Sequence, residues 1–278
     1  MSTETIYNVK RKKFGISEQI IVYSKAVVGG VQSPNKGKTI EQIVRKAKTI
    51  SEYKYRNLKC IKDSSRRSKK MIYDVTRSNI WEWFVTITFN PELVDSMDYE
   101  ECVKKLSKWI NNIRTRNCTG MVYIFVPELH KSGRYHFHGL ISHCEGLQFE
   151  NSGHFDKGGN IIYNIGKYKL GFTTATKVRN SEAAEKYIAK YVTKELTSHL
   201  KGKRRYWKSK NCKVPDLEYY FNKRDTHMDL HDSLISRSDY LFAQEKEYTD
   251  KQGKSQYVRY YEFKGGNDDQ RDDIKAHE

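Results

Sequence analysis

The sequence of 278 residues contains few cysteines and prolines and no long hydrophobic run. Its cysteines are odd in number and lack a C-x-x-C pair, so we expect reduced thiols, without disulfides or a structural zinc site. No segment approaches the ~18 consecutive apolar residues that span a bilayer, so we expect no membrane partner. The first residues carry four cations at 10–13 but no apolar block or cleavage site, which predicts a cytoplasmic protein. The cysteines are Cys60, Cys102, Cys118, Cys144 and Cys212.

A phosphate-binding loop of the form G-x-x-x-x-G-K-[ST] is also missing. The glycine-rich stretch 29–38 has neither the spacing nor the Ser or Thr of that motif. We therefore expect neither ATP binding nor a helicase domain in this chain.

Positive charge is what the sequence has in excess, with a formal net charge of +17. Residues 1–80 carry +13, residues 81–223 carry +8, and residues 224–278 carry −4. This distribution and the motifs below predict a basic DNA-binding region at 1–79, a catalytic domain at 80–223 and an acidic extension at 224–278. A surplus of this size favours a polyanionic partner, although ordinary solvated surface charge is the alternative interpretation.

The order of the expected elements predicts an α+β domain built on an antiparallel sheet. Strands are expected at 84–89, 121–128, 135–142 and 172–178, with amphipathic helices at 98–116 and 182–196. A glycine-rich loop is expected through 153–158. Two short basic helices are expected at 38–50 and 64–79, where they could lie along phosphates.

The segment 128–138 contains a candidate metal site. His136 and His138 share one face of a strand, because side chains alternate between the two faces. If Lys131, Ser132 and a left-handed Gly133 form a three-residue hairpin loop, Glu128 pairs with His136 and becomes a third ligand. A two-residue loop would instead pair Glu128 with Phe137.

Histidines elsewhere compete with these ligands. His130 shares the parity of Glu128 but is expected nearer the turn, in an outer position. His227 and His231 have helical i, i+4 spacing, but no strand accompanies them. An H-x-H pair alone is more often a surface or core feature than a metal site, and the carboxylate is what favours a metal here.

A second candidate group has the spacing of one helical stripe, at Tyr187, Lys190, Tyr191 and Lys194. The structural interpretation is an amphipathic helix with packed tyrosines and snorkelling lysines. The catalytic interpretation makes a tyrosine the nucleophile, since nearby ammonium groups favour its phenolate. Further along, Lys203, Arg204, Arg205, Tyr206 and Trp207 interleave cations with aromatic rings, which predicts contact with DNA or else a solvated loop with a core Trp.

Three motifs in this order resemble those of the HUH endonucleases that initiate rolling-circle replication: F-V-T-I-T-F at 84–89, H-F-H at 136–138 and Y-I-A-K-Y-V-T-K at 187–194. The paired tyrosines look like those of phage and plasmid initiators. The resemblance covers about 80–200. It implies a central five-stranded antiparallel sheet with flanking helices.

The resemblance also implies an activity. Mg²⁺ or Mn²⁺ would be held by Glu128, His136 and His138, and Tyr191 or Tyr187 would form a 5′-phosphotyrosine, assisted by Lys190 and Lys194. Expected partners are single-stranded and duplex origin DNA, with a host helicase and DNA polymerase in a bacterial cell. A relaxase or transposase of the same superfamily is one alternative. A non-catalytic basic DNA-binding protein is the other.

Overall fold

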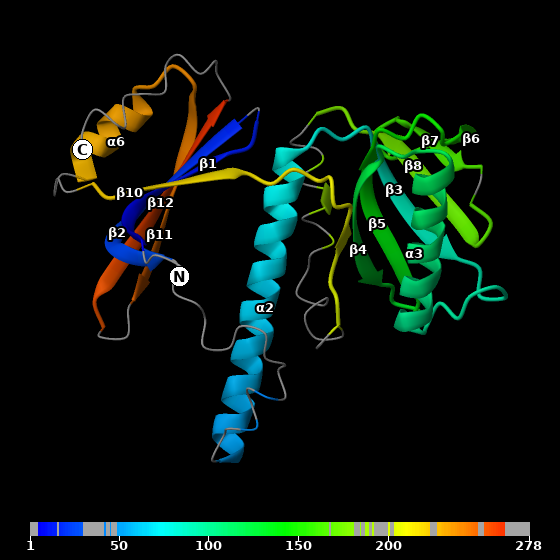
Figure 1. Cartoon of the computed structure of the whole chain (residues 1–278), viewed down its shortest axis with the longest axis horizontal. Helices are drawn as coiled ribbons and strands as arrows, with labels where there is room; N and C mark the ends of the chain where they lie inside the picture. Colours follow the sequence, from blue (N-terminus) through cyan, green and yellow to red (C-terminus); the bar gives the residue numbers. More distant parts are fainter. Residues whose placement is uncertain are drawn as a thin grey trace. The chain divides into compact units, whose positions relative to one another are not determined.

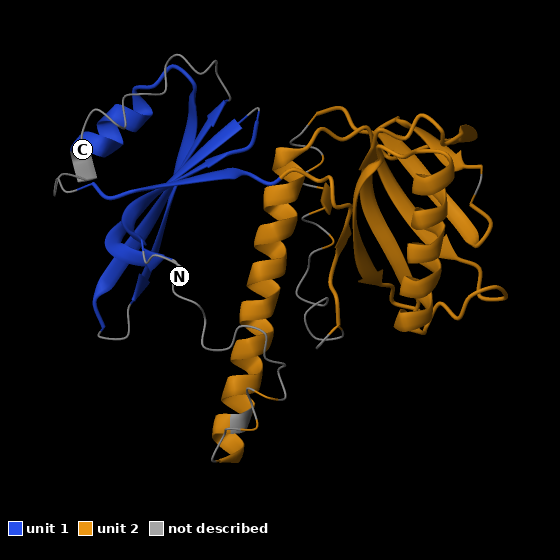
Figure 2. Ribbon diagram, in the orientation of Figure 1, with its two compact units in different colours: residues 1–37, 214–278 blue, residues 38–213 orange. Residues whose placement is uncertain are grey.

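The computed structural model describes residues 5–15, 17–29, 42, 45, 49–166, 168–180, 184, 187–188, 191, 200, 203–222, 227–249 and 253–264. The chain forms two compact units, residues 1–37 with 214–278 and residues 38–213, coloured separately in Figure 2. Both units contain an antiparallel sheet, so the α+β class is confirmed. The two ends of the chain share one unit, which differs from the three consecutive regions expected from charge. None of the described helices is long and apolar enough to cross a membrane.

The larger unit is built on a seven-stranded sheet with the order β6-β7-β8-β3-β5-β4-β9. Its strands are β3 (Trp83–Phe89), β4 (Val122–Leu129), β5 (Tyr135–Ser142), β6 (Phe149–Phe155), β7 (Ile161–Ile165), β8 (Gly171–Lys177) and β9 (Trp207–Lys208). Four of them lie within a residue of the expected strands. The resemblance predicted five strands, and the HUH fold itself remains a prediction.

The two faces of this sheet carry different helices. On one face lies α3 (Tyr99–Arg116), which Figure 1 shows beside β3 and β5. Its Leu106 and Ile110 belong to one buried cluster with Ile87 and Phe137 of the sheet. Asp98 caps the N-terminus of α3, because its carboxylate accepts hydrogen bonds from the backbone N–H groups of Glu100 and Glu101.

The opposite face packs against the carboxyl half of α2 (Ile50–Ser78). Ile72 and Val75 are buried there against Ile124 and Leu140. Ala184 and Ile188, from the expected tyrosine helix, join the same cluster. The even-numbered side chains of β3 and β5, including both candidate metal histidines, therefore face α2 and the tyrosine segment.

Two expectations about local structure were wrong. The basic segment at 64–79 is not a short helix but the second half of the 29-residue α2, which Thr49 caps by accepting from the Glu52 N–H. Most of 38–48 lies outside the described residues. The segment through Gly153 and Gly158, expected to be a loop, forms the β6–β7 hairpin. Its strand β6 is exposed at the edge of the sheet and therefore does not need alternating apolar residues.

The smaller unit has a five-stranded sheet with the order β10-β1-β2-β12-β11. Its strands are β1 (Thr5–Lys13), β2 (Ser17–Gly29), β10 (Asp216–Tyr220), β11 (Tyr240–Thr249) and β12 (Ser255–Lys264). Leu234 of α6 (His227–Ile235) packs on one face with Val9, Ile20 and Tyr261. The sheet joins both ends of the chain, since β1 pairs with β10 and β2 pairs with β12.

The cations at 10–13 are part of this sheet rather than a free basic arm. Arg11 is 3% exposed, and it donates to Glu18 at 2.7 Å and to Glu218 at 3.3 Å. Lys13 contacts the same Glu218 carboxylate at 2.6 Å. Buried charges require such partners. This part of the predicted DNA-binding region therefore has a structural role in the fold.

Candidate active site

The β4–β5 hairpin has the register that the three-residue loop predicts. Glu128 pairs directly with His136, and Gly133 has a left-handed φ of 80°. The ends of the loop are closed by a hydrogen bond from the His130 N–H to the Arg134 carbonyl at 2.9 Å. Glu128, His136 and His138 consequently lie on one face of the sheet, on two adjacent strands.

His138 is the centre of this face. Its Nε2 lies 2.6 Å from Oε2 of Glu128, while Nδ1 lies 3.0 Å from Oγ1 of Thr86 and 3.4 Å from the hydroxyl of Tyr187. The His138 side chain is 6% exposed and that of Glu128 is 41% exposed. The pair therefore reaches solvent on the carboxylate side, where a phosphate could approach.

His136 belongs to the same face but is less closely joined. Its ring stacks on that of His130, with centroids 5.3 Å apart and planes 10° apart. In the described part of the chain, the triad does not form a group in which all three ligand atoms lie within 4.8 Å of one another. The structure thus joins Glu128 and His138 directly and places His136 beside them, with His130 stacked on its ring.

Neighbouring groups and burial shift the pKa values of the residues on this face. The hydrogen bond from His138 lowers the pKa of the Glu128 carboxyl and outweighs the effect of burial. Burial lowers the pKa of His136, assisted by the nearby His130 and His138. Glu128 is therefore favoured as a carboxylate and His136 as a neutral imidazole, the forms that bind a divalent ion.

Both candidate nucleophiles lie against His138, in different positions. The Tyr191 ring stacks on the His138 ring with centroids 3.5 Å apart. Tyr187 instead packs on Phe84, and its hydroxyl lies 3.2 Å from Oγ1 of Thr86. Their sequence spacing of one helical turn is what brings both rings to one imidazole.

The surroundings of the two phenols distinguish them further. Burial raises the pKa of Tyr187, which is the more enclosed of the two. The pKa of Tyr191 is also raised by burial and by the Glu128 charge, but a hydrogen bond from Tyr187 opposes that rise. The expected lowering of tyrosine pKa values by Lys190 and Lys194 stays a prediction, because both lysines lie outside the described residues.

Thr86 is a site residue that the sequence analysis missed. It pairs with His138 across β3 and β5, and its hydroxyl contacts both His138 and Tyr187. The strand pattern F-V-T-I-T-F carries the signal, since its two threonines alternate with buried apolar residues. Recognising it required knowing that β3 lies beside β5.

The aromatic part of the predicted DNA-binding segment is partly buried. Trp207 lies in the core against Tyr99 and Phe137, so its ring is unavailable to a base, and the expectation of stacking there was wrong. Trp207 is in the core because β9 pairs it with Phe125. Tyr206 is half-buried and packs with the hydrophobic cluster beneath α2.

The cations of the same segment differ in exposure. Lys203 and Arg204 are exposed, whereas Arg205 is 7% exposed. Lys203 pairs with Glu100 at 3.4 Å and lies over the Tyr99 ring, whereas Arg204 forms no ion pair with a described carboxylate. DNA contact by this segment stays a prediction for both.

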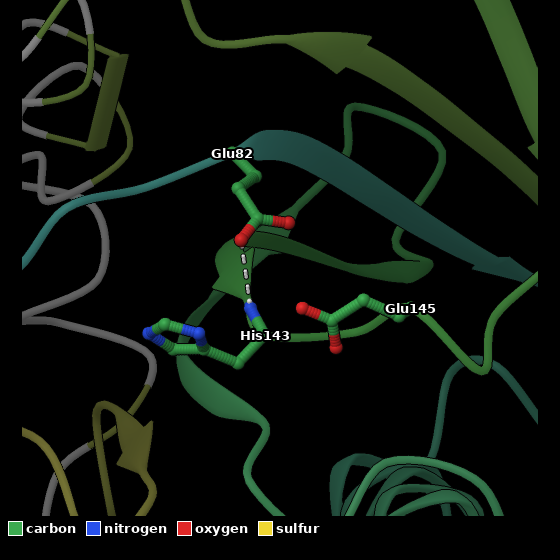
Figure 3. A group of neighbouring side chains, drawn as sticks. All are labelled: Glu82, His143 and Glu145. Atoms are coloured by element: carbon green, nitrogen blue, oxygen red, sulfur yellow. Dashed lines mark hydrogen bonds between the residues drawn. The ribbon is translucent and has the colours of Figure 1, made fainter.

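A separate group of possible ligands lies where β3 begins and β5 ends. Glu82, His143 and Glu145 have ligand atoms within 4.8 Å of one another, and Figure 3 shows their side chains. His143 and Glu145 are exposed. Glu82 accepts from the His143 backbone N–H at 3.0 Å, which fixes a turn in which His143 has a φ of 52°. This contact gives Glu82 a structural role.

Comparison with known proteins supports one family. Residues 82–196 match the model of a family described as replication-associated protein ORF2. The match includes β3, the β4–β5 hairpin and both tyrosines, and it covers about two fifths of the chain. Searches of curated proteins and of solved structures gave no match.

Proposed function

We propose that this protein initiates rolling-circle replication by nicking and rejoining a specific DNA strand through a 5′-phosphotyrosine intermediate. The observation that carries the proposal is the position of His138, between the Glu128 carboxylate on one side and Tyr187 and Tyr191 on the other. The candidate metal ligands and the candidate nucleophiles therefore lie together in one small site. The family match over 82–196 supports the role in replication.

The residues of this site fit a divalent metal. Two imidazoles and a carboxylate are ligands that Mn²⁺ or Mg²⁺ accepts, and Glu128 and His138 already direct a ligand atom toward each other. Glu128, His136 and His138 would hold the ion, which would polarise the scissile phosphate. Thr86, beside Nδ1 of His138, orients that ring, as outer hydrogen bonds commonly do for metal-bound histidines.

Tyr191 is the proposed first nucleophile. Its ring lies directly on His138, and the hydrogen bond from Tyr187 opposes part of the rise in pKa that burial causes. The phenol oxygen attacks the phosphorus, a tyrosyl ester forms with the 5′ phosphate, and the 3′ oxygen leaves and takes up a proton. The ester preserves the energy of the broken bond, so rejoining requires no ATP.

Tyr187 is suited to the second transfer. Its hydroxyl contacts Oγ1 of Thr86 and Nδ1 of His138. When the circle is complete, Tyr187 attacks the phosphorus of the regenerated junction, forms a second 5′-phosphotyrosine and releases the 3′ hydroxyl of the displaced strand. That hydroxyl attacks the ester on Tyr191, which closes the displaced strand into a circle and frees the Tyr191 phenol. Lys190 and Lys194 would stabilise charge on the phenolates or the phosphate. A host helicase would open the duplex and a host DNA polymerase would extend the 3′ end.

The decisive experiment is to incubate the protein with a library of single-stranded oligonucleotides and Mn²⁺, then to map cleaved and covalently bound strands. A strand-specific cut with the 5′ end on a tyrosine would support the proposal. A protein that binds the strands without an adduct would be a non-catalytic DNA-binding protein. A relaxase or transposase would share the adduct, and the rejoining of circles from a nicked origin would separate an initiator from these.

A further inference from the structure

Helix α2 presents a row of positive charges to solvent. Ser65, Ile72 and Val75 mark its buried side, and the last two pack in the cluster against the sheet of the same unit. Five cations lie on the opposite side, and all are exposed. We call them the α2 stripe: Lys59, Lys62, Arg66, Lys69 and Lys70.

The stripe is continuous along the helix. At ~100° per residue its members lie within an arc of about 100°. The first four follow one another at three- and four-residue steps, and Lys70 lies four residues after Arg66. From Lys59 to Lys70 the helix rises ~16 Å. A B-DNA duplex carries roughly nine phosphate charges over that length, so the helix and a DNA backbone match in extent.

Helix stability does not explain this pattern. Residues three or four apart on a helix are neighbours, and like charges at that spacing repel. Within 59–70 there are six Lys and Arg residues and one acid, Asp63. Asp63 contacts Arg66 at 3.3 Å, and no other member of the stripe forms an ion pair with a described carboxylate. A polyanion would relieve the repulsion that the chain itself leaves in place.

A second observation in the same region is the state of Arg205. This side chain is 7% exposed and donates from Nη1 to Oγ of Ser64 on α2 at 2.6 Å. Its Nε and Nη2 have no hydrogen-bond partner among the described residues. Burial lowers the pKa of Arg205, and the neighbouring Arg67 lowers it further. Positive charge around α2 is thus uncompensated both beneath the helix and on its surface.

Charge is also distributed unequally between the two units. Residues 38–213 hold 35 Lys and Arg against 17 Asp and Glu, whereas 1–37 with 214–278 hold 16 against 17. The net charge is +18 in the first and −1 in the second. The positive surplus therefore belongs to the unit that carries α2.

We propose that the α2 stripe binds the phosphate backbone of duplex DNA. Single-strand binding sites combine cations with aromatic rings for base stacking, and residues 59–70 contain no aromatic residue. Phosphate contacts by Lys and Arg hold a duplex without reading bases. This binding site lies outside 82–196, which match the replication family, and it does not depend on the proposed nicking chemistry.

The test compares two variants with equal charge change. In the stripe variant, Lys59, Lys62, Arg66, Lys69 and Lys70 are changed to Gln, which preserves helix propensity. In the control variant, five exposed cations of the same unit are changed to Gln: Lys104, Lys108, Arg116, Lys157 and Lys210. Binding of a fluorescent 30-bp duplex and of its single strand is measured in EDTA by anisotropy, from 50 to 300 mM salt.

The stripe variant should bind the duplex at least tenfold more weakly, and its slope of log affinity against log salt should be shallower by up to about 4.5. Single-strand binding should change much less. A partial variant, Lys62→Gln with Lys69→Gln, should give about two fifths of the slope change. Equal losses in the stripe and control variants, or equal losses for duplex and single strand, would overturn the proposal. Nicking of a short single strand, measured separately, should persist and so separates this outcome from failure of the proposed catalysis.

Discussion

The ring of Tyr191 lies flat on the imidazole of His138, with centroids 3.5 Å apart and planes 10° apart. The Tyr187 ring meets His138 edge-on at 6.2 Å, and its hydroxyl is engaged by Thr86. Two tyrosines one helical turn apart are therefore not equivalent. The Tyr191 ring covers the face of the His138 ring, whereas the Tyr187 ring meets its edge and the Tyr187 hydroxyl contacts Thr86.

This difference predicts how the tyrosines divide the reaction. Tyr191→Phe should remove most initial nicking and covalent adduct, whereas Tyr187→Phe should still nick but fail in the second transfer that closes a circle. The double variant should form no adduct. Mass spectrometry of the trapped 5′-phosphotyrosyl peptide locates the nucleophile, and an adduct on neither residue would refute the mechanism.

Loss of a candidate metal ligand should separate cleavage from binding. His138→Ala and His136→Ala should each reduce cleavage with Mn²⁺ by about 100-fold or more, while most DNA affinity remains, because phosphate contacts supply it. EDTA should inhibit the wild type to the same extent. Since His138 is buried, the half-buried His136 provides the variant less prone to misfolding. Unchanged cleavage by the wild type in EDTA would refute the metal assignment.

Thr86 should act by positioning His138. Thr86→Val removes the hydroxyl that contacts Nδ1 of His138 at 3.0 Å, and we expect a 10- to 100-fold loss of Mn²⁺ affinity or activity. Thr86→Ser keeps the hydroxyl and should restore most of both. Mn²⁺ titration by calorimetry, made alongside nicking assays, checks the effect on the metal independently of catalysis. If Mn²⁺ affinity were unchanged in both variants, Thr86 would not position His138.

Glu218 should make the smaller unit sensitive to acid. Burial raises its pKa, but Lys13, Tyr220 and Arg11 outweigh that effect and bring the pKa to about 2. A carboxyl with a depressed pKa stabilises the fold above its ordinary value, and the stabilisation is lost as pH falls from about 4.5 to about 2. Glu218→Gln should therefore lower Tm at pH 7, and its difference from the wild type should shrink near pH 2.5. A difference that is constant across this range would contradict the ion-pair explanation.

Gly139 should be irreplaceable in β5. A Cβ there would overlap the Phe125 ring on β4 and lie 3.0 Å from the Ile124 carbonyl oxygen. Gly139→Ala should cost about 1–3 kcal/mol of unfolding free energy, as overpacking of a core typically does. Gly120→Ala, whose Cβ would meet its nearest atom at 3.9 Å, is the matched control and should change stability by less than about 0.5 kcal/mol. Urea unfolding of both variants measures the difference.

The sequence alone determined the features that depend on neighbouring residues. A hairpin loop of three residues sets its own register, so counting predicted the pairing of Glu128 with His136 under that loop length, with Phe137 as the partner under a two-residue loop. The spacing of Tyr187 and Tyr191 placed both on one side of a helix in the same way. These relations extend over at most a few residues, where backbone geometry fixes the outcome.

Only the tertiary structure decided which distant segments meet. Arg11 is paired with Glu218, 207 residues away, so a run of cations within the predicted DNA-binding region 1–79 is instead an interior strand of a sheet. Thr86 became part of the site because β3 lies beside β5, and Trp207 entered the core because β9 pairs with β4. Pairing of distant strands depends on burial summed over a whole sheet, and no local pattern in the sequence specifies it.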